Sequence, residues 1–361
     1  MSLSLGPIKS TLYTSIDWYR THKLVLFHNE IAKDTVVANN IPVLPPKVAH
    51  EVNSFWRKYV NHDIGLYYHR IAALSIPAEK LPFVVSDSVL CPFIIKKLNP
   101  EERSSSLSDK GLYNVIFSDV KRPTEIVRNI RGNFLDNGNE LIDRTTAIRK
   151  IQDYNKPIII KPSVGSYGGD GVKIINSLDE TNIGQTFDLY KTDFVVQELL
   201  KQSPQTARFN PTSLNTFRIL SLLLNGHYSL LGAWLKCGGK DSVVDNLTCG
   251  GMASCIAPEG KMSYGISVMN PRIETSPTGK RFENCQIEHF DRILRSAEQL
   301  HRRIPSMAMV GWDFALDIYD EPVFIEANLL RPDTWPWQMT QGPIFGDRLQ
   351  EVLDFCFPDI K

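Results

Sequence analysis

Two short segments near the end of the chain carry side-chain oxygens at spacings suited to a metal ion. Strict alternation in the runs GWDFALDI and VFIEAN places Asp313 on one face of the first run, and Glu326 and Asn328 on one face of the second. A turn at Asp320–Glu321 would set Asp313 opposite Asn328, with Glu326 as a diagonal neighbour within about 7 Å. Hard oxygen donors without histidine or cysteine favour Mg²⁺. We therefore predict a magnesium site, with a solvated hairpin face as the alternative.

The stretch IIIKPSVGSYGGDGVKII has the composition of a phosphate-binding loop. Two apolar runs flank four glycines, Gly165, Gly168, Gly169 and Gly171, and Lys161 ends the first run. Glycine lets backbone N–H groups turn toward a phosphate without a Cβ in the way, and the lysine adds a positive charge. The loop matches neither GxxxxGK[ST] nor GxGxxG, which excludes a P-loop and a Rossmann fingerprint. The alternative interpretation is an ordinary glycine-rich hairpin.

Two further segments could contribute to the same anion site. Arg218 lies at the start of an otherwise apolar strand-like run (NTFRI), and Asn246 belongs to the loop DNLTCGG. The two glycines of that loop would allow a close approach to an anion. Taken separately, Arg218 could equally be a surface cap and Gly250–Gly251 a plain turn.

The pattern of short apolar runs indicates an α+β chain with antiparallel hairpins, which is not the regular strand–helix alternation of a doubly wound sheet. The predicted strands are residues 157–161, 172–175, 194–198, 217–224, 229–236, 312–318 and 323–328. Apolar spacing predicts a helix over 286–304. Residues 1–108 are predicted to be mostly helical, and within them Val48, Val52, Phe55 and Tyr59 recur on one face of a helix.

Composition narrows the class of protein. The 361 residues include 40 Lys+Arg and 40 Asp+Glu, and this zero formal charge argues against non-specific nucleic-acid binding. Six scattered cysteines form no disulfide framework and suit a reducing compartment. The N-terminus lacks the pattern of a signal peptide. The apolar window 217–235 is interrupted by Arg218 and by Asn225–Gly226, which predicts a hairpin and no membrane span. We expect a cytoplasmic protein.

Taken in chain order, five motifs resemble the ATP-grasp superfamily over roughly residues 110–345. They are KPSVGSYGGDGV, VVQELL, NTFRI, DNLTCGG and GWDFALDIYDEPVFIEAN. The Asn-x-x-x-Gly-Gly and Gly-Trp-Asp…Glu-x-Asn pieces resemble ribosomal-protein glutamate ligases and D-alanine–D-alanine ligases. The whole chain, including PTEIVR at 123–128, most resembles the sugar-transfer-associated ATP-grasp proteins of bacterial polysaccharide gene clusters. The resemblance implies two α+β lobes gripping ATP after a mostly helical N-terminal region, with divisions at 1–108, 109–196 and 197–361.

The resemblance also implies roles for individual residues. Those implied to bind ATP are Lys110, Lys161, Gly165, Ser166, Gly168, Gly169, Gly171, Gln197, Glu198, Leu199 and Leu200, the last four as the adenine hinge. Arg218 and Asn246 would hold the γ-phosphate or an acyl phosphate, and Lys236 stands where the glutamate ligases carry an arginine. The implied cofactors are ATP and one or two Mg²⁺, for which Mn²⁺ could substitute.

The activity that the resemblance implies is ADP-forming ligation of a small-molecule carboxylate to an amine through an acyl phosphate, in surface polysaccharide biosynthesis. A kinase acting on a sugar or polyol hydroxyl and a nucleotide-binding scaffold without turnover are the alternatives. Arg331 and Arg128 are predicted to pair with a substrate carboxylate, because arginine presents a fork of donors. For each of them the alternative is a solvated surface charge.

Overall fold

The computed structural model describes residues 6–166, 168–242 and 244–360, with side chains of the first helix described from Tyr19 onward. The chain divides into two compact units. Unit 1 contains the described residues up to Pro100, the short segment Met269–Pro271 and the residues from Asp333 onward. Unit 2 contains Glu101–Val268 and Arg272–Pro332.

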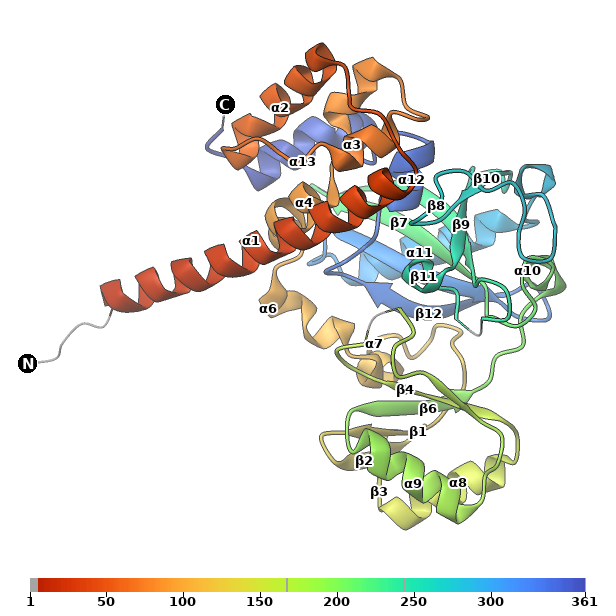
Figure 1. Ribbon diagram of the computed structural model, residues 1–361. Coiled ribbons are helices and arrows are strands. Elements are labelled where there is room, and N and C mark those ends of the chain that lie inside the picture. Colours follow the sequence, from red (N-terminus) through yellow and green to blue (C-terminus); the bar gives the residue numbers. More distant parts are fainter. Residues whose placement is uncertain (1–5, 167, 243, 361) are drawn as a thin grey trace, which may run out of the picture. The chain divides into compact units, whose positions relative to one another are not determined.

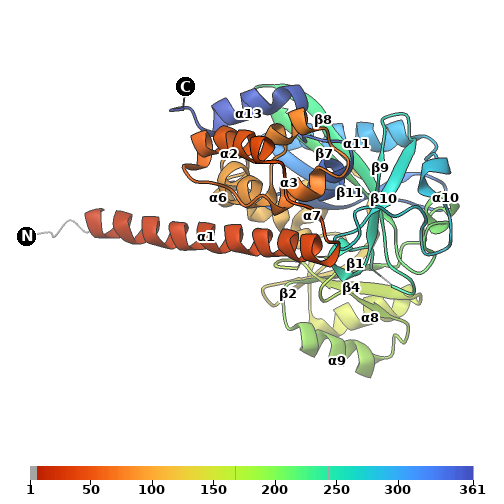
Figure 2. The same cartoon turned by 45° about the horizontal axis from the view of Figure 1, so that its top comes forward.

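Unit 1 is helical, as the sequence predicts for the first hundred residues. Its helical segments are α1 (Gly6–Ala38), α2 (Pro46–Val60), α3 (Tyr67–Ala72), η1 (Ala78–Phe83), α4 (Asp87–Val89), η2 (Leu90–Ile95), α5 (Lys96–Leu98), α12 (Trp335–Thr340), η7 (Gly346–Arg348) and α13 (Leu349–Cys356). Helix α1 is one long continuous helix (Figure 2). The predicted helix is present as α2, and its buried residues are Val52, Trp56 and Val60. Of the four residues predicted to form its apolar face only Val52 is buried, and Val48, Phe55 and Tyr59 are half-buried.

Unit 2 begins with four short helical segments and then forms a first sheet. The helical segments are α6 (Glu101–Ser104), η3 (Ser106–Ser108), η4 (Lys110–Leu112) and α7 (Tyr113–Ile116). The strands are β1 (Glu125–Ile130), β2 (Asn133–Asp136), β3 (Leu141–Ile142), β4 (Ile158–Pro162), β5 (Lys173–Ile175) and β6 (Phe194–Glu198). Their order is β3-β2-β1-β6-β4-β5, with antiparallel neighbours throughout.

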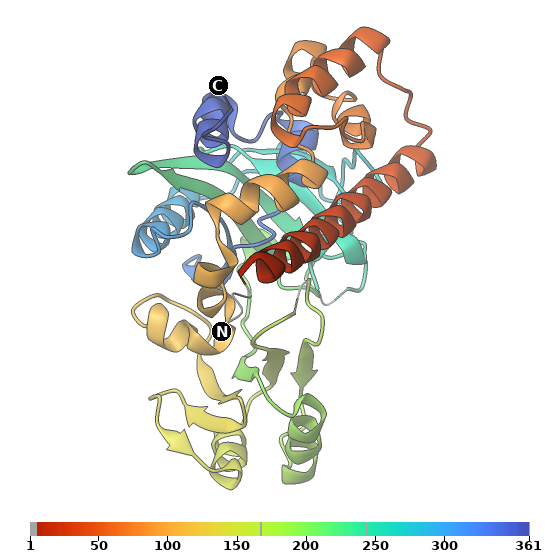
Figure 3. The ribbon, with the colours of Figure 1, turned by 90° about the vertical axis from the view of Figure 1, so that its left-hand side faces the viewer.

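Helices α8 (Arg144–Tyr154) and α9 (Glu180–Tyr190) cover one face of this sheet (Figure 1, Figure 3). Each starts at an aspartate, Asp143 or Asp179, whose carboxylate accepts a hydrogen bond from a backbone N–H of the first turn. Apolar side chains such as Ile151 and Phe187 form the core between these helices and the strands. The strands contribute residues such as Ile160 and Val196 to this core. Because side chains alternate along a strand, the residues next to them in the sequence point to the opposite face of the sheet.

The second sheet holds the predicted oxygen-rich hairpin. Its strands are β7 (Thr216–Leu224), β8 (His227–Cys237), β9 (Met252–Ile256), β10 (Met262–Ile266), β11 (Met309–Leu316) and β12 (Pro322–Asn328), in the order β10-β9-β8-β7-β11-β12. The remaining helical segments are α10 (Pro204–Ala207), η5 (Leu247–Cys249), η6 (Phe282–Asn284) and α11 (Phe290–Arg303). Helix α11 packs on the sheet through an apolar core that includes Phe290, Leu300 and Trp312. Two antiparallel sheets with covering helices confirm the predicted α+β class.

The predicted strands are present, with ends shifted by up to three residues. Asn225 and Gly226 have positive φ angles of 51° and 79° and join β7 to β8, which confirms the predicted hairpin. The predicted helix over 286–304 is shorter, because Gln286 forms a β-bridge with Lys261 and α11 starts at Phe290. Within the described part of the chain, no helix has the length and apolar character needed to cross a membrane. The six cysteines, all within the described part of the chain, are not joined by disulfide bonds.

A buried chain of hydrogen bonds ties α11 to the second sheet. The Trp312 indole N–H donates to Ser221 Oγ at 3.0 Å, and Ser221 Oγ lies 2.7 Å from His301 Nδ1. His301 Nε2 lies 2.8 Å from the carbonyl oxygen of Met307. Burial lowers the pKa of His301 to about 4, so the ring is neutral at pH 7. A neutral ring that donates from Nε2 accepts a hydrogen bond from the Ser221 hydroxyl at Nδ1. The polar groups that take part in this series of hydrogen bonds are then all paired.

Ser221→Ala should lower the free energy of unfolding by about 1 to 3 kcal/mol, because the indole N–H of Trp312 and His301 Nδ1 would both lose a buried partner. Urea unfolding followed by fluorescence measures the change. Ser105, which is exposed and makes no capping bond, provides the control, and Ser105→Ala should stay within about 0.5 kcal/mol of wild type. Equal effects of the two substitutions would contradict the role of the buried chain.

Candidate functional site

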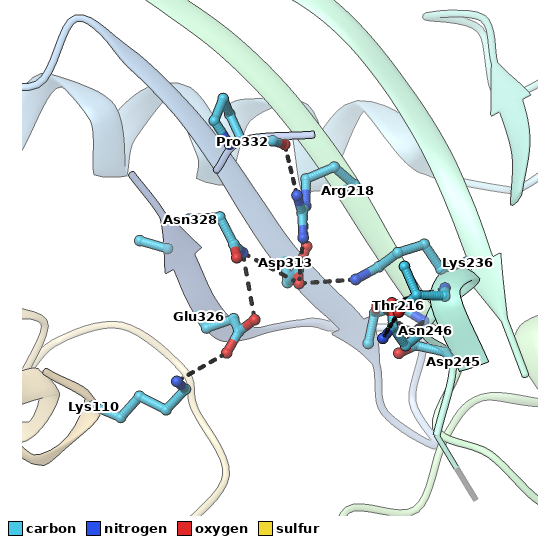
Figure 4. Close-up of polar contacts among 12 residues, drawn as sticks. Lys110, Thr216, Arg218, Lys236, Asp245, Asn246, Asp313, Glu326, Asn328 and Pro332 are labelled. Carbon is cyan, nitrogen blue, oxygen red and sulfur yellow. Dashed lines mark hydrogen bonds and ion pairs between the residues drawn. The ribbon is translucent and has the colours of Figure 1, made fainter. Parts of the chain in front are cut away.

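Three neighbouring strands bring two cations onto one buried carboxylate. Asp313 on β11 lies opposite Arg218 on the neighbouring strand β7. Lys236 lies on β8, the next strand of the sheet. The Asp313 carboxylate accepts hydrogen bonds from Arg218 Nε at 2.5 Å, Arg218 Nη2 at 3.1 Å and Lys236 Nζ at 2.9 Å (Figure 4). Burial alone would raise the pKa of Asp313, but the two cations outweigh it and hold the pKa well below its usual range.

The β11–β12 hairpin brings the three predicted metal ligands together in a different register from the predicted one. Asp313 lies directly opposite Glu326, and Asn328 lies opposite Gly311. The turn is longer than predicted, because the Asp317 carboxylate accepts backbone hydrogen bonds from Tyr319 and Glu321 and the strands pair only from Leu316 and Pro322. A bulge after Asp313 then shifts the pairing by one residue.

Glu326 and Asn328 form a more open part of the cluster. The Asn328 amide nitrogen lies 3.4 Å from Asp313 Oδ2 and 3.4 Å from Glu326 Oε1. Lys110 Nζ lies 3.3 Å from Glu326 Oε2, and the Glu326 side chain is 27% exposed (Figure 4). The backbone N–H of Lys110 donates to the carbonyl oxygen of Ser163, which fixes η4 beside the end of β4. The structure therefore brings Lys110 to the predicted metal ligands.

The face of the first sheet that points away from α8 and α9 carries polar groups. Gln197 on β6 pairs with Glu125 on β1, and Lys161 lies on the same face of β4. Burial and the positive charge of Lys110 lower the pKa of Lys161 to about 8. Gln197 Oε1 is buried and has no hydrogen-bond partner among the described residues. An unpaired buried acceptor is costly, so this oxygen is suited to a ligand donor.

The other predicted hinge residues differ in their surroundings. The Glu198 carboxylate accepts hydrogen bonds from the backbone N–H of Thr124 at 2.7 Å and from its hydroxyl at 3.0 Å. Leu199 is exposed and Leu200 is half-buried. These contacts hold the Glu198 side chain against the residue that precedes β1, and the hinge assignment stays a prediction.

The glycine loop lies against the loop that contains Asn246. Gly165, Gly168, Gly169 and Gly171 all have positive φ angles, which favour glycine. A Cβ on Gly168 would lie 2.1 Å from the Asn246 amide nitrogen, and a Cβ on Gly169 would lie 2.9 Å from Val244. Ser166 Oγ donates to the carbonyl oxygen of Pro162 at 3.4 Å, while Tyr167 lies outside the described residues. The glycines therefore permit close contact between the two loops.

Asp245, beside Asn246, belongs to the cluster although the sequence did not single it out. Its carboxylate accepts hydrogen bonds from the hydroxyl of Thr216 and from the backbone N–H of Thr216 at 3.1 Å (Figure 4). Burial raises the pKa of Asp245, and the charge of Lys236 opposes that shift. The only signal in the sequence was an acid next to Asn246 in a glycine-containing loop.

Arg128 and Arg331, the predicted substrate ligands, lie in different environments. Arg128 is 2% exposed and pairs with Glu125 at 2.7 Å. Its Nη1 also donates to the Asp136 carbonyl oxygen and its Nη2 to the Asn139 side chain, while Nε is buried without a described partner. Its described partners thus belong to its own lobe, so it is not a solvated surface charge. Arg331 is exposed and follows Asn328 by three residues.

Glu125 is a second polar residue that the sequence did not single out. One of its carboxylate oxygens accepts hydrogen bonds from Arg128 and from the Asn114 amide, at 2.7 Å each, and the other oxygen is buried without a described partner. Burial raises the pKa of Glu125, and Arg128 opposes the shift. Its polar surroundings were not visible in the sequence, because Asn114 comes from a separate helical segment.

The oxygen ligands and lysines of this site are suited to a hard cation and a polyphosphate. Among the described residues, no group of three or more His, Cys, Asp or Glu side chains is suited to hold a metal ion. A metal bound here would therefore need the amide oxygen of Asn328 and ligand oxygens beside the Glu326 carboxylate, which is the usual coordination of Mg²⁺ at a phosphate site. Lys161 and Lys110 supply positive charge close by.

Comparisons with known proteins identify the family of the chain. The profile of the sugar-transfer associated ATP-grasp proteins matches residues 93–354, which is well over half of the chain. A search of curated proteins found no match.

Solved structures that resemble the chain include three enzymes of low sequence identity. They are D-alanyl-alanine synthetase A from Vibrio cholerae (13% identity, TM-score 0.40), biotin carboxylase from Campylobacter jejuni (12%, 0.45) and L-amino acid ligase from Bacillus licheniformis (11%, 0.40). The alignments cover 70, 72 and 71% of this chain and 67, 48 and 51% of those chains, respectively. The chain thus spans about half to two thirds of the length of these proteins. On the family match, the chain belongs to the sugar-transfer associated ATP-grasp family and has the ATP-grasp fold.

Proposed function

We propose that the protein is an ADP-forming carboxylate–amine ligase. A substrate carboxylate takes the γ-phosphoryl group of ATP, and the amine then forms the amide as phosphate leaves. The observation that carries the proposal is the set of cations around two carboxylates, with Arg218 and Lys236 at Asp313 and Lys110 at Glu326. Such groups position and neutralise charge, which is most of what phosphoryl transfer requires.

The first sheet and its neighbours offer groups for the nucleotide. Gln197 Oε1 would accept a hydrogen bond from the 6-amino group of adenine. Lys161 and Lys110 would contact the phosphates, and backbone N–H groups of the glycine loop would face the same oxygens. Mg²⁺ held by Glu326 and Asn328 would supply charge neutralisation between the β- and γ-phosphates.

The residues around Asp313 are suited to the second half of the reaction. Arg218 and Lys236 would hold the negative oxygens of the phosphorylated carboxylate, and Asn246 would contact them from the neighbouring loop. Contact of the glycine loop with Asn246 would limit the access of water to an acyl phosphate. The family description links these proteins to sugar transfer, which supports a cytoplasmic role in bacterial surface polysaccharide synthesis with a sugar acid or amino acid as substrate.

The test is trapping of the acyl phosphate. The protein is incubated with MgATP, hydroxylamine and a panel of sugar acids and amino acids, and ADP and hydroxamate are both measured. We expect ADP release that depends on a carboxylate and yields hydroxamate in equal amount. Phosphorylation of neutral sugars without hydroxamate would replace the ligase with a hydroxyl kinase, and ATP binding without any turnover would leave a scaffold.

Arg331→Ala should raise the KM of the best carboxylate about tenfold while leaving the KM of ATP unchanged, because a charge-assisted pair with an exposed arginine contributes about 1.5 kcal/mol. Steady-state kinetics on that substrate give both values. Arg295, an exposed arginine that pairs with Asp291 on α11, provides the matched control, and Arg295→Ala should behave as wild type. Unaltered kinetics in Arg331→Ala would leave Arg331 as a surface charge.

A further inference from the structure

The three predicted metal ligands do not have the same surroundings. Both oxygens of Asp313 already accept hydrogen bonds from cations, at 2.5 Å and 3.1 Å from Arg218 and at 2.9 Å from Lys236. The Asp313 side chain is only 4% exposed. Glu326, by contrast, has one cation at 3.3 Å and a 27% exposed side chain. A ligand can therefore reach Glu326 far more readily than Asp313.

The local fold fixes Arg218 in this position. Arg218 Nη1 donates to the carbonyl oxygen of Pro332 at 2.6 Å, while Nε and Nη2 both face Asp313. Gly311 leaves room for the guanidinium stem, since a Cβ there would lie 3.0 Å from Arg218 Cδ and 2.7 Å from the Pro332 oxygen. The guanidinium is thus held along three of its nitrogens, as expected for a group whose direction matters.

A metal ion at Asp313 would compete with these cations. A divalent ion bound to either Asp313 oxygen would lie close to both Arg218 and Lys236, where like charges repel strongly in a buried site. Asp245 beside Thr216 and Lys236 adds a further carboxylate to balance the two cations. The Arg218–Asp313–Lys236 cluster is therefore complete without a metal.

We propose that Asp313 is a positioning residue that holds Arg218 and Lys236 as a fixed pair of cations for the transferred phosphoryl group, and that a single divalent ion is bound by Glu326, Asn328 and phosphate oxygens. This inference rests on the proposed function. It assigns to two side-chain cations the neutralisation that a second metal ion would otherwise supply.

The test counts bound metal rather than turnover alone. Mn²⁺ binding to the full-length protein with saturating ADP is measured by electron paramagnetic resonance of free Mn²⁺, for wild type, Asp313→Asn and Glu326→Gln. Wild type should bind one Mn²⁺ per chain. Asp313→Asn should keep that ion with an affinity within about threefold of wild type, whereas Glu326→Gln should weaken it about tenfold or more.

Kinetics separate positioning from a general loss of structure. Asp313→Asn should lower kcat about 10- to 100-fold with the KM of ATP nearly unchanged, and Asp313→Glu should recover part of kcat. Asp313→Asn leaves Arg218 and Lys236 buried without the negative charge that they face. The double variant Asp313→Asn/Lys236→Met removes one charge of each sign, so the net charge of the site is unchanged. The Mn²⁺ count is repeated on this variant. It should also keep one ion.

Two outcomes would overturn the inference. One is two Mn²⁺ per wild-type chain, a result that needs no variant to fold. The other is an equal loss of Mn²⁺ affinity in Asp313→Asn and Glu326→Gln. Wild-type protein that binds no ADP would instead overturn the proposed function, and this inference would fall with it. The same experiment distinguishes that result from the two outcomes above.

Discussion

Glu326→Gln is expected to lower turnover by about 10²- to 10³-fold while leaving binding of metal-free ADP nearly unchanged. Glu326 is the more accessible carboxylate of the cluster, and replacing it with an amide removes the negative charge that faces Lys110 and the proposed metal. The groups proposed to bind adenine and the phosphates, Gln197 and Lys161, belong to the first sheet and are not altered.

Calorimetry with ADP in the presence of a chelator and ADP release with MgATP measure the two quantities. Glu321, a half-buried acid in the turn of the same hairpin that pairs with Arg292, provides the matched control. Glu321→Gln should retain wild-type activity and binding. Full MgATP turnover in Glu326→Gln would remove Glu326 from the proposed metal site, and loss of metal-free ADP binding would show that the substitution disturbs more than the metal.

The oxygen-rich hairpin could be predicted from the sequence because alternation along a strand is a local property. GWDFAL and VFIEAN alternate strictly enough to assign the faces of Asp313 and of Glu326 with Asn328. The register could not be predicted, because it depends on the bonds that the Asp317 carboxylate makes to the turn and on a bulge after Asp313. The composition of a short turn does not specify either feature.

The first strand of the first sheet has no clear signal in the sequence. In β1 (Glu125–Ile130) the buried residues include Glu125, Arg128 and Asn129. Polar residues thus occupy buried strand positions at which apolar residues are usual. Their burial depends on partners such as Asn114 that lie outside the strand. A pattern-based prediction can find a strand from its apolar face, but it cannot find one whose buried side chains pair with each other.

The partners of Asp313 could not be predicted for a related reason. Arg218 and Lys236 lie 95 and 77 residues away in the sequence, and only the strand order β8-β7-β11 makes them neighbours. Arg218 stands out in the sequence as a charged residue in an otherwise apolar run, but nothing in the sequence indicates that it forms an ion pair with Asp313. The geometry of the proposed anion site therefore depends on topology, which the local pattern does not determine.

Nucleotide affinity is expected to fall as pH rises through about 8 in the wild-type protein, and to lose this dependence in Lys161→Arg. Burial and the charge of Lys110 lower the pKa of Lys161 to about 8, so in the free protein Lys161 loses its charge above that pH. Phosphate oxygens bind the protonated form, and binding above pH 8 therefore requires uptake of a proton. The guanidinium of Lys161→Arg stays charged throughout.

The same pKa shift has the opposite effect on the stability of the free protein. The unfolded chain keeps the Lys161 proton up to the ordinary pKa of 10.5, whereas the folded protein releases it near 8. Between these values the unfolded state binds more protons, so the contribution of Lys161 to the free energy of unfolding rises with pH. Loss of ADP binding above pH 8 therefore cannot be ascribed to unfolding caused by this residue.

Calorimetric titration of ADP from pH 7 to 9.5, in buffers of different ionisation enthalpy, measures both affinity and proton uptake. Lys161→Ala should bind ADP about 10- to 100-fold more weakly at pH 7, because it loses a charge-assisted contact to phosphate, and its affinity should not change near pH 8. Lys173 on β5 is exposed and close in sequence, and Lys173→Ala should keep the wild-type affinity and pH profile. If the wild-type profile shows no proton uptake, Lys161 is not the residue that meets the phosphates; if Lys161→Ala binds ADP as tightly as wild type, the nucleotide lies elsewhere on the first sheet.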